Sequence, residues 1–182
     1  MIENNQKHQR HGLLINITGN GKGKTTSALG TAMRALGWGW TVKVIQFVKS
    51  SGATGEKRFA DNSTLPIEII PMGAGLTWKS KYSEEEHINR ANTAWNAVKE
   101  VICEDNIDLL ILDELNIALH KSWINAEDVI TFLESRPKWQ HVIITGRYAM
   151  PEIIAASDLV SEVQEVKHPY KAGIKAQKGI DF

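Results

Sequence analysis

Residues 19–26 constrain the fold of this chain more than any other segment. They read Gly-Asn-Gly-Lys-Gly-Lys-Thr-Thr and lie between a short apolar run, residues 13–18, and a helical pattern, residues 24–36. Glycines allow several backbone N–H groups to converge on one anion, and the N-terminus of the following helix adds unpaired donors and about half a positive charge. The sequence therefore predicts a buried strand, a phosphate-binding loop and a helix, in this order.

Two side chains complete the predicted phosphate site. Lys24 supplies a mobile positive charge, and the hydroxyl of Thr25 can bind a magnesium ion held by the same phosphates. The segment departs from the usual pattern at Thr18, where a first glycine is expected, so a loop that begins at Gly19 is one residue shorter. We expect the nucleotide phosphates to bind to the whole segment, which comprises Gly19, Asn20, Gly21, Lys22, Gly23, Lys24, Thr25 and Thr26.

Apolar runs and helical patterns alternate along the rest of the chain. The sequence predicts helices at 83–102 and 125–133, an exposed loop at 49–64, and strands at 41–47, 66–71, 107–112, 141–145 and 159–166. Apolar strands that alternate with helices indicate an α/β fold, with a mostly parallel sheet flanked by helices. Because ligands of such sheets bind beyond the carboxyl ends of the strands, the residues that follow each strand are the candidates for function.

Two adjacent carboxylates follow the apolar run at 107–112. Asp113 and Glu114 would lie at the same edge of the sheet as the phosphate loop, where one can hold magnesium and the other can polarise a water molecule. The alternative is that Asp113 only caps the next turn or helix. The sequence does not indicate which carboxylate binds the ion, so the candidate metal ligands are Thr25, Asp113 and Glu114.

Composition excludes several classes of function. The 21 Lys and Arg residues equal the 21 Asp and Glu residues in number, which argues against coating of nucleic acid or of an anionic membrane. No stretch approaches the roughly 18 apolar residues of a membrane helix. The single cysteine, Cys103, allows no internal disulfide and suits the cytoplasm. We expect a flexible polar arm at residues 1–11 and a single domain over residues 12–182.

A protein nucleophile is missing from the sequence. No Gly-x-Ser-x-Gly motif is present, and no predicted helix carries two histidines at the spacing of a metal site. His8 and His11 are three residues apart, but they lie in the predicted polar arm. The site is therefore expected to act by positioning and charge neutralisation, with the reactive atom supplied by another molecule.

Four segments occur in a specific order over about residues 12–182: TGNGKGKTT, LLILDELNIAL, TGRYAMPEII and KHPYKAGIKAQKGIDF. Together they resemble the P-loop corrinoid adenosyltransferases, the ATP:cob(I)alamin adenosyltransferases of cobalamin synthesis and salvage. The resemblance implies a RecA-like P-loop NTPase fold. It also implies transfer of the 5′-deoxyadenosyl group of ATP to the Co(I) of a corrinoid, with release of triphosphate. Cobalt would then be the nucleophile, which agrees with the absence of one in the protein.

The resemblance also implies cofactors, partners and further site residues. Family members are homodimers that use ATP, Mg²⁺ and a corrinoid, and an N-terminal arm can cap the partner's corrin site. A reductase or flavodoxin would supply electrons to the cobalt. The family motif Gly-Phe-Thr-Trp, which displaces the lower ligand of the corrin, corresponds here to Gly75-Leu76-Thr77-Trp78. Leu76, Thr77 and Trp78 are the expected corrin-binding residues, and the leucine is expected to alter efficiency or corrinoid preference.

Other functions fit the same residues. A small-molecule kinase would use Asp113 or Glu114 as a base for an acceptor hydroxyl and would release ADP. A nucleotide-switched ATPase would hydrolyse ATP slowly and change shape around the phosphates. The zero net charge and the lack of a long basic run make nucleic-acid binding the least favoured alternative.

Overall fold

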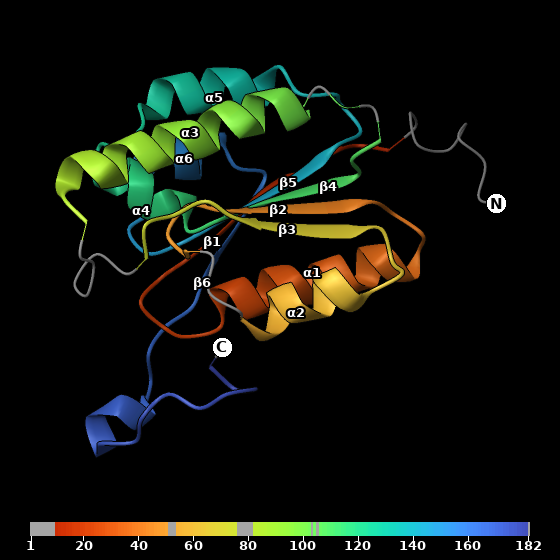
Figure 1. Ribbon diagram of the computed structural model, residues 1–182. Helices are drawn as coiled ribbons and strands as arrows, with labels where there is room; N and C mark the ends of the chain where they lie inside the picture. The colour runs from red at the N-terminus through yellow and green to blue at the C-terminus, as the bar shows by residue number, and fades with distance from the viewer. Residues whose placement is uncertain (1–9, 51–53, 76–81, 103, 105, 182) are drawn as a thin grey trace.

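Six parallel strands form a single sheet in the order β3-β2-β4-β5-β1-β6 in the computed structural model of this chain (Figure 1). The structure describes residues 10–50, 54–75, 82–102, 104 and 106–181. The strands are β1 (Leu14–Thr18), β2 (Val42–Gln46), β3 (Ile67–Pro71), β4 (Leu109–Asp113), β5 (His141–Thr145) and β6 (Leu159–Glu162). The predicted α/β fold with a parallel sheet is therefore confirmed.

Helices cover both faces of the sheet (Figure 1). The helices are α1 (Lys24–Gly37), α2 (Gly55–Asn62), α3 (Glu84–Ile102), α4 (Leu115–His120), α5 (Ala126–Glu134), α6 (Pro151–Ala156) and a short 3-10 helix, η2 (Pro169–Ala172). The helices α1 and α2 lie on one face, and α3, α4, α5 and α6 lie on the other. All five residues of β4 are buried, as expected for a central strand with apolar cover on both faces. None of the described helices is both long and apolar enough to span a bilayer.

The helix α2 corrects the prediction that residues 49–64 form an exposed loop. Its N-cap is Thr54, whose Oγ1 accepts a hydrogen bond from the Lys57 N–H at 3.4 Å, and Lys57 forms an ion pair with Asp61 one turn later. Ala60 is the one buried residue of this helix. The helix therefore has no apolar stripe for hydrophobic periodicity to reveal, and its cap and charge pair support it instead.

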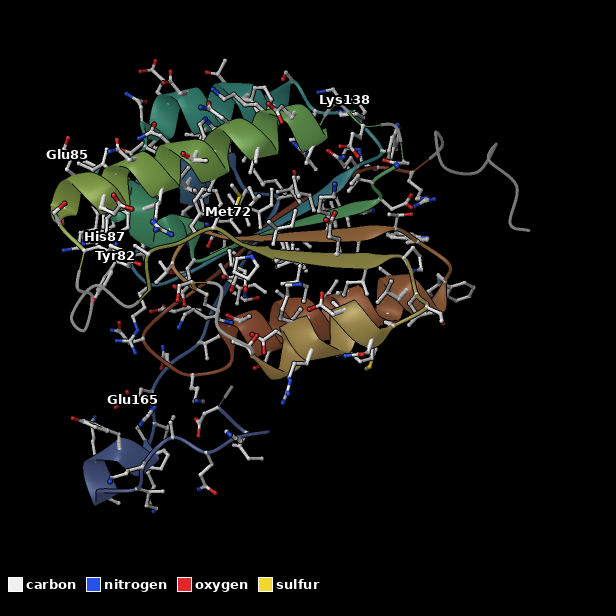
Figure 2. All side chains as sticks on the ribbon, viewed as in Figure 1. Met72, Tyr82, Glu85, His87, Lys138 and Glu165 are labelled. Atoms are coloured by element: carbon white, nitrogen blue, oxygen red, sulfur yellow. The ribbon has the colours of Figure 1, made fainter. Side chains whose placement is uncertain are left out.

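The first described residues lie at the amino-terminal edge of the sheet, away from the phosphate loop. Arg10 donates to Asp108 Oδ1 at 3.0 Å and lies 4.1 Å from the ring centroid of Trp40. The Gly12 N–H donates to the carbonyl of Lys138 at 2.7 Å, and Lys138 lies at this same edge (Figure 2). Of the arm expected at residues 1–11, residues 1–9 lie outside the described part of the chain.

Two buried amides connect β1 to the segment that follows β4. Asn116 Nδ2 donates to Asn16 Oδ1 at 3.0 Å and to the carbonyl of Gly146 at 3.2 Å, and both asparagines are fully buried. The pair therefore holds α4, and the acidic residues just before it, against the strand that leads into the phosphate loop.

We expect Asn116→Ala to lower the free energy of unfolding by about 1–3 kcal/mol, because it leaves the buried amide of Asn16 without its partner. Urea unfolding followed by circular dichroism measures the cost for Asn116→Ala, Asn16→Ala and the double variant. The double variant should cost less than the two single variants together, since each single change already breaks the pair. Strictly additive costs would contradict this interpretation.

Candidate active site

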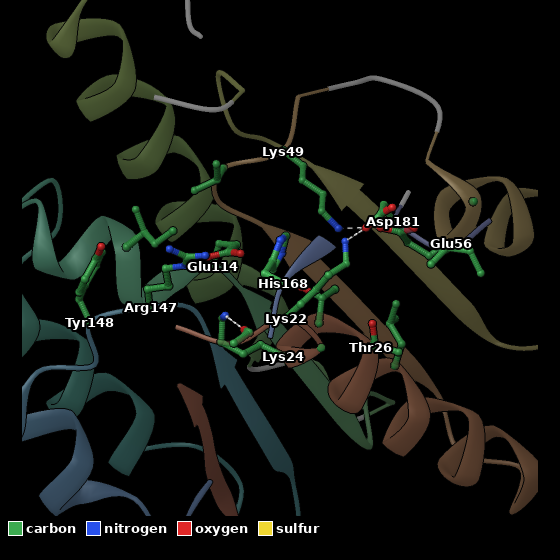
Figure 3. Close-up of a pocket in the computed structure, with 18 of the residues that line it drawn as sticks. Lys22, Lys24, Thr26, Lys49, Glu56, Glu114, Arg147, Tyr148, His168 and Asp181 are labelled. Carbon is green, nitrogen blue, oxygen red and sulfur yellow. Dashed lines mark hydrogen bonds and ion pairs between the residues drawn. The ribbon is translucent and has the colours of Figure 1, made fainter. Parts of the chain in front are cut away.

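A cavity of about 870 Å³ opens at the carboxyl edge of the sheet, where the segments after β1, β2, β4 and β5 meet (Figure 3). This is the edge at which ligands of parallel sheets bind. Its lining carries cationic and anionic side chains together: Lys22, Lys24, Lys49, Lys121 and Arg147, and Glu56, Glu114 and Asp181. The excess of cations makes the cavity suitable for an anionic ligand.

The phosphate loop has a conformation that only glycine tolerates at several positions. Gly23 is the N-cap of α1 and has a φ of +115°. A Cβ on Gly21 would lie 2.6 Å from the carbonyl oxygen of Gln164, and the Gly21 N–H donates to the carbonyl of Val163 at 2.7 Å. The segment after β6 therefore lies directly behind the loop. Residues 21–26 line the cavity, whereas Gly19 and Asn20 are not part of its lining.

Lys24 begins α1 and is buried at the wall of the cavity, with 7% of its surface exposed. Its Nζ donates to the carbonyl of Gly21 at 2.7 Å. Burial is the largest influence on this group and lowers the pKa of Lys24, Arg147 lowers it further, and Glu114 and Asp113 act in the opposite direction. An anion that enters the cavity would favour the charged ammonium and offset the cost of its burial.

Asp113 is fully buried and accepts hydrogen bonds at both carboxylate oxygens. Its Oδ1 accepts from Thr25 Oγ1 at 2.7 Å and from Thr145 Oγ1 at 2.8 Å. Its Oδ2 accepts from Gln46 Nε2 at 2.9 Å and lies 3.5 Å from Lys49 Nζ. These contacts join the ends of three strands and the start of α1, so Asp113 fixes the position of the Thr25 hydroxyl.

Glu114 differs from its neighbour because one of its oxygens has no partner. Its backbone is in the left-handed region, with a φ of +65°, and its N–H donates to Thr145 Oγ1 at 2.9 Å. Its Oε2 is buried and accepts no hydrogen bond from any described residue. Burial, followed by the adjacent charge of Asp113, raises the pKa of Glu114. An unpartnered carboxylate oxygen beside a phosphate loop is suited to bind a cation.

The described residues contain no group of three or more His, Cys, Asp and Glu side chains arranged to hold a metal on their own. A divalent ion would therefore need ligands from the nucleotide as well as from the protein. Mg²⁺ is commonly bound in this way, by one or two protein oxygens together with substrate phosphates and water. The Thr25 hydroxyl and the Glu114 carboxylate, both in the cavity lining, fit this requirement.

Sequence reasoning did not single out three charged groups of the cavity. Lys49 Nζ lies 2.6 Å from Glu56 Oε1, and Lys22 forms an ion pair with Asp181 (Figure 3). Lys49 could have been found from its place just after β2, at the carboxyl edge of the sheet. No local pattern marks Glu56 or Asp181, which reach the cavity from α2 and from the end of the chain. The expected corrin-binding residues 76–78 lie outside the described residues.

An aromatic wall closes one side of the cavity. Tyr148 has a φ of +63° and stacks on His120, with ring centroids 4.6 Å apart. Both residues line the cavity, and Arg147 next to them adds a cation to the same side. A left-handed backbone at a bulky residue is uncommon and occurs often at functional sites.

Comparison with known proteins identifies close relatives of this chain. The model of the family described as ATP:corrinoid adenosyltransferase BtuR/CobO/CobP matches residues 10–182. The corrinoid adenosyltransferase of Pseudomonas aeruginosa is 41% identical over 177 residues, which cover 97% of this chain and 87% of that protein. The corrinoid adenosyltransferase of Escherichia coli strain K12 is 38% identical over 97% of this chain and 89% of its own length.

A solved structure shares the fold at much lower sequence identity. The flagellar accessory protein FlaH from Methanocaldococcus jannaschii superposes with a TM-score of 0.55 and 16% identity, over 84% of this chain and 71% of that one. At this level of identity the similarity concerns the fold alone.

Proposed function

The chain belongs to the family of ATP:corrinoid adenosyltransferases, and we propose that the cavity at its phosphate loop is where ATP and the corrinoid react. The enzyme transfers the adenosyl group of ATP to a corrinoid, which is the reaction of the family to which it belongs. The observation that carries the assignment of the site is the convergence of Lys24, Thr25 and Glu114 on this cavity. The relatives do not favour a kinase or a switched ATPase.

In the proposed reaction, Co(I) of the corrinoid attacks C5′ of ATP. A Co–C bond forms, the C5′–O bond breaks, and the electron pair leaves with the triphosphate oxygen. Lys22, Lys24 and the N-terminus of α1 would bind the triphosphate and stabilise the negative charge that develops on it. Holding C5′ in line with the cobalt would contribute by proximity, on the order of 7–11 kcal/mol at best.

We assign the proposed Mg²⁺ to Thr25 and Glu114, with Asp113 as the group that orients Thr25. The unpartnered Oε2 of Glu114 supports this division, as do the three short hydrogen bonds that Asp113 already accepts. When bound, the ion would neutralise part of the charge on the triphosphate. Lys24 would neutralise another part from within the loop.

Leu76, Thr77 and Trp78 are the proposed corrin-binding residues. Because Leu76 lacks the flat ring that the family's motif has at this position, we expect Leu76→Phe to change the efficiency or corrinoid preference of the enzyme. Turnover with cobalamin and with an incomplete corrinoid, together with the spectrum of four-coordinate Co(II), measures this. Unchanged turnover and an unchanged spectrum would show that the ring has no role here.

Two further features of the proposal come from the family resemblance: a homodimeric enzyme, and an electron-donating reductase or flavodoxin as partner. Two others come from composition and length: a single domain over residues 12–182 and a cytoplasmic location.

The products of the reaction test the proposed function. Under anaerobic conditions, the purified protein is mixed with reduced cobalamin, ATP and Mg²⁺, and the loss of the Co(I) absorbance is followed. We expect adenosylcobalamin and triphosphate in equal amounts. Formation of ADP would indicate a kinase, and slow release of phosphate without a change at cobalt would indicate an ATPase.

A further inference from the structure

Lys49 enters the cavity from a fixed backbone. It follows β2, and its carbonyl accepts a hydrogen bond from the Gly73 N–H at 2.9 Å. Its side chain is 30% exposed, and its ammonium points toward the same region as that of Lys22, which comes from the opposite wall (Figure 3). A lysine from a separate segment of the chain is therefore positioned at the cavity together with the two lysines of the phosphate loop.

The contacts of Lys49 show that its main partner is Glu56. The Nζ–Oε1 distance to Glu56 is 2.6 Å, whereas the distance to Asp113 Oδ2 is 3.5 Å. Asp113 already accepts three shorter hydrogen bonds from Thr25, Thr145 and Gln46, so it does not need Lys49 to satisfy its oxygens. If Lys49 served only to neutralise Asp113, its ammonium would not need to lie closer to Glu56 than to Asp113.

Lys49 carries its charge at neutral pH. Burial on its own would lower the pKa of Lys49, but Asp113 and Glu56 outweigh this and raise it. Burial on its own would raise the pKa of Glu56, but the hydrogen bond from Lys49, with other contacts, outweighs burial and lowers it. The two groups therefore form an ion pair within the cavity lining.

The loop lysines show the same arrangement. Lys22 forms an ion pair with Asp181, and Lys24 donates to the carbonyl of Gly21. Each of the three lysines is thus bonded to an oxygen of the protein at the place where an anionic ligand would enter. Exchanging a protein oxygen for a phosphate oxygen preserves a charge-assisted hydrogen bond, so the exchange has a low cost for the lysine.

We infer that Lys49 is a triphosphate-binding residue of this enzyme, and that Glu56 holds its ammonium until the triphosphate of ATP replaces the carboxylate. The inference rests on the proposed function, because it takes the cavity as the ATP site. After the exchange, the charge of Glu56 is still stabilised without Lys49. Glu56 lies in the first turn of α2, where the helix dipole stabilises a negative charge.

The inference predicts opposite effects for the two partners. Removing the ammonium with Lys49→Met should weaken binding of inorganic triphosphate about tenfold or more, the usual effect of losing one charge-assisted hydrogen bond. Glu56→Gln should tighten it about threefold, because the competing charge is gone. The double variant should bind like Lys49→Met alone, since Glu56 acts only through Lys49.

Isothermal titration calorimetry with inorganic triphosphate and Mg²⁺ measures these effects without any corrinoid. Asp61→Asn is the matched control. It removes a carboxylate from the same helix, α2, but this carboxylate pairs with Lys57 and not with Lys49. It should leave triphosphate binding unchanged. Lys49→Arg keeps a positive charge and should bind triphosphate more tightly than Lys49→Met. This comparison separates the effect of losing the cation from the effect of losing folded protein.

The outcomes distinguish the inference from the proposed function. If the unmodified enzyme does not bind triphosphate, the proposed site is wrong. If it binds triphosphate and Lys49→Met binds equally well, only the inference is overturned. If Lys49→Met binds weakly but Glu56→Gln gains nothing, or the double variant recovers affinity, the exchange between Glu56 and triphosphate is overturned.

Discussion

Replacing Lys24 with alanine is expected to lower kcat/KM for adenosyl transfer by at least about 10²- to 10³-fold. Lys24 is the only side chain in the proposed mechanism that brings a full charge to the triphosphate from the first turn of α1. Removing a single preorganised group that stabilises charge in a transition state commonly has an effect of this size. The anaerobic assay with reduced cobalamin, ATP and Mg²⁺ measures the loss.

The fold should survive this substitution. Burial lowers the pKa of Lys24, which means that the charged ammonium is less favourable in the folded chain than in the unfolded chain. Removing the ammonium should therefore not reduce the melting temperature. Lys138→Ala is the matched control, because it removes an exposed lysine at the opposite edge of the sheet. Retained turnover in Lys24→Ala would exclude the phosphate loop from the mechanism.

Local patterns predicted most of the elements that carry the site. The strands at residues 41–47, 107–112 and 141–145 appear as β2, β4 and β5, each within a few residues of the expected bounds. The helix expected at residues 125–133 appears as α5, and its N-cap is Asn125, whose Oδ1 accepts from the N–H groups of Glu127 and Asp128. These elements were predictable because buried strands and capped helices leave periodic or local signals in the sequence.

One helix that was missed and one strand whose end was misplaced lack such signals. The helix α2 is polar on nearly every side, and the last strand ends at Glu162 rather than continuing to Val166. Its residues are all exposed at the edge of the sheet, so no burial pattern fixes where it ends.

The limits of sequence reasoning are clearest at the site itself. The phosphate loop and the acidic pair are contiguous motifs, and the carboxyl-edge rule brought them together correctly. The partners of the lysines come from distant parts of the chain: Asp181 is 159 residues from Lys22. Nor does the sequence show why two adjacent carboxylates differ. The difference arises because the side chains of Thr25, Gln46 and Thr145 all donate to the carboxylate of Asp113. None of these three side chains donates to the carboxylate of Glu114, whose Oε2 has no partner among the described residues.

The difference between the two carboxylates leads to a prediction about Glu114→Gln. We expect this variant to lose adenosyl transfer by about 10²-fold or more at a fixed Mg²⁺ concentration, because an amide oxygen is a weaker ligand for the ion than a carboxylate. We also expect it to be more stable than the unmodified enzyme at pH 8 in the absence of nucleotide. A rise of about 1 kcal/mol would correspond to about 2–4 °C in the melting temperature of a domain of this size.

The sign of the stability effect follows from the direction of the pKa change. Burial and Asp113 raise the pKa of Glu114 above its ordinary value of 4.5. Below that value the carboxyl is protonated in both the folded and the unfolded chain, and the two proteins should be almost equally stable. As the pH rises, the unfolded chain loses this proton first, so the unmodified enzyme loses stability relative to the variant until Glu114 ionises in the folded state as well. Above that pH the difference is constant.

Thermal unfolding from pH 4 to pH 8, with and without Mg²⁺ and triphosphate, measures both parts of this prediction. The ligands should stabilise the unmodified enzyme and reverse the order of the two proteins, because a bound cation makes the buried charge of Glu114 favourable. Glu127→Gln is the control, since Glu127 lies at the first turn of α5, away from the cavity lining. A Glu114→Gln variant that is less stable at every pH would show that this carboxylate supports the fold rather than the metal. In that case Asp113 would have to be the ligand, and Thr25 would have to exchange its hydrogen bond to Asp113 for the ion.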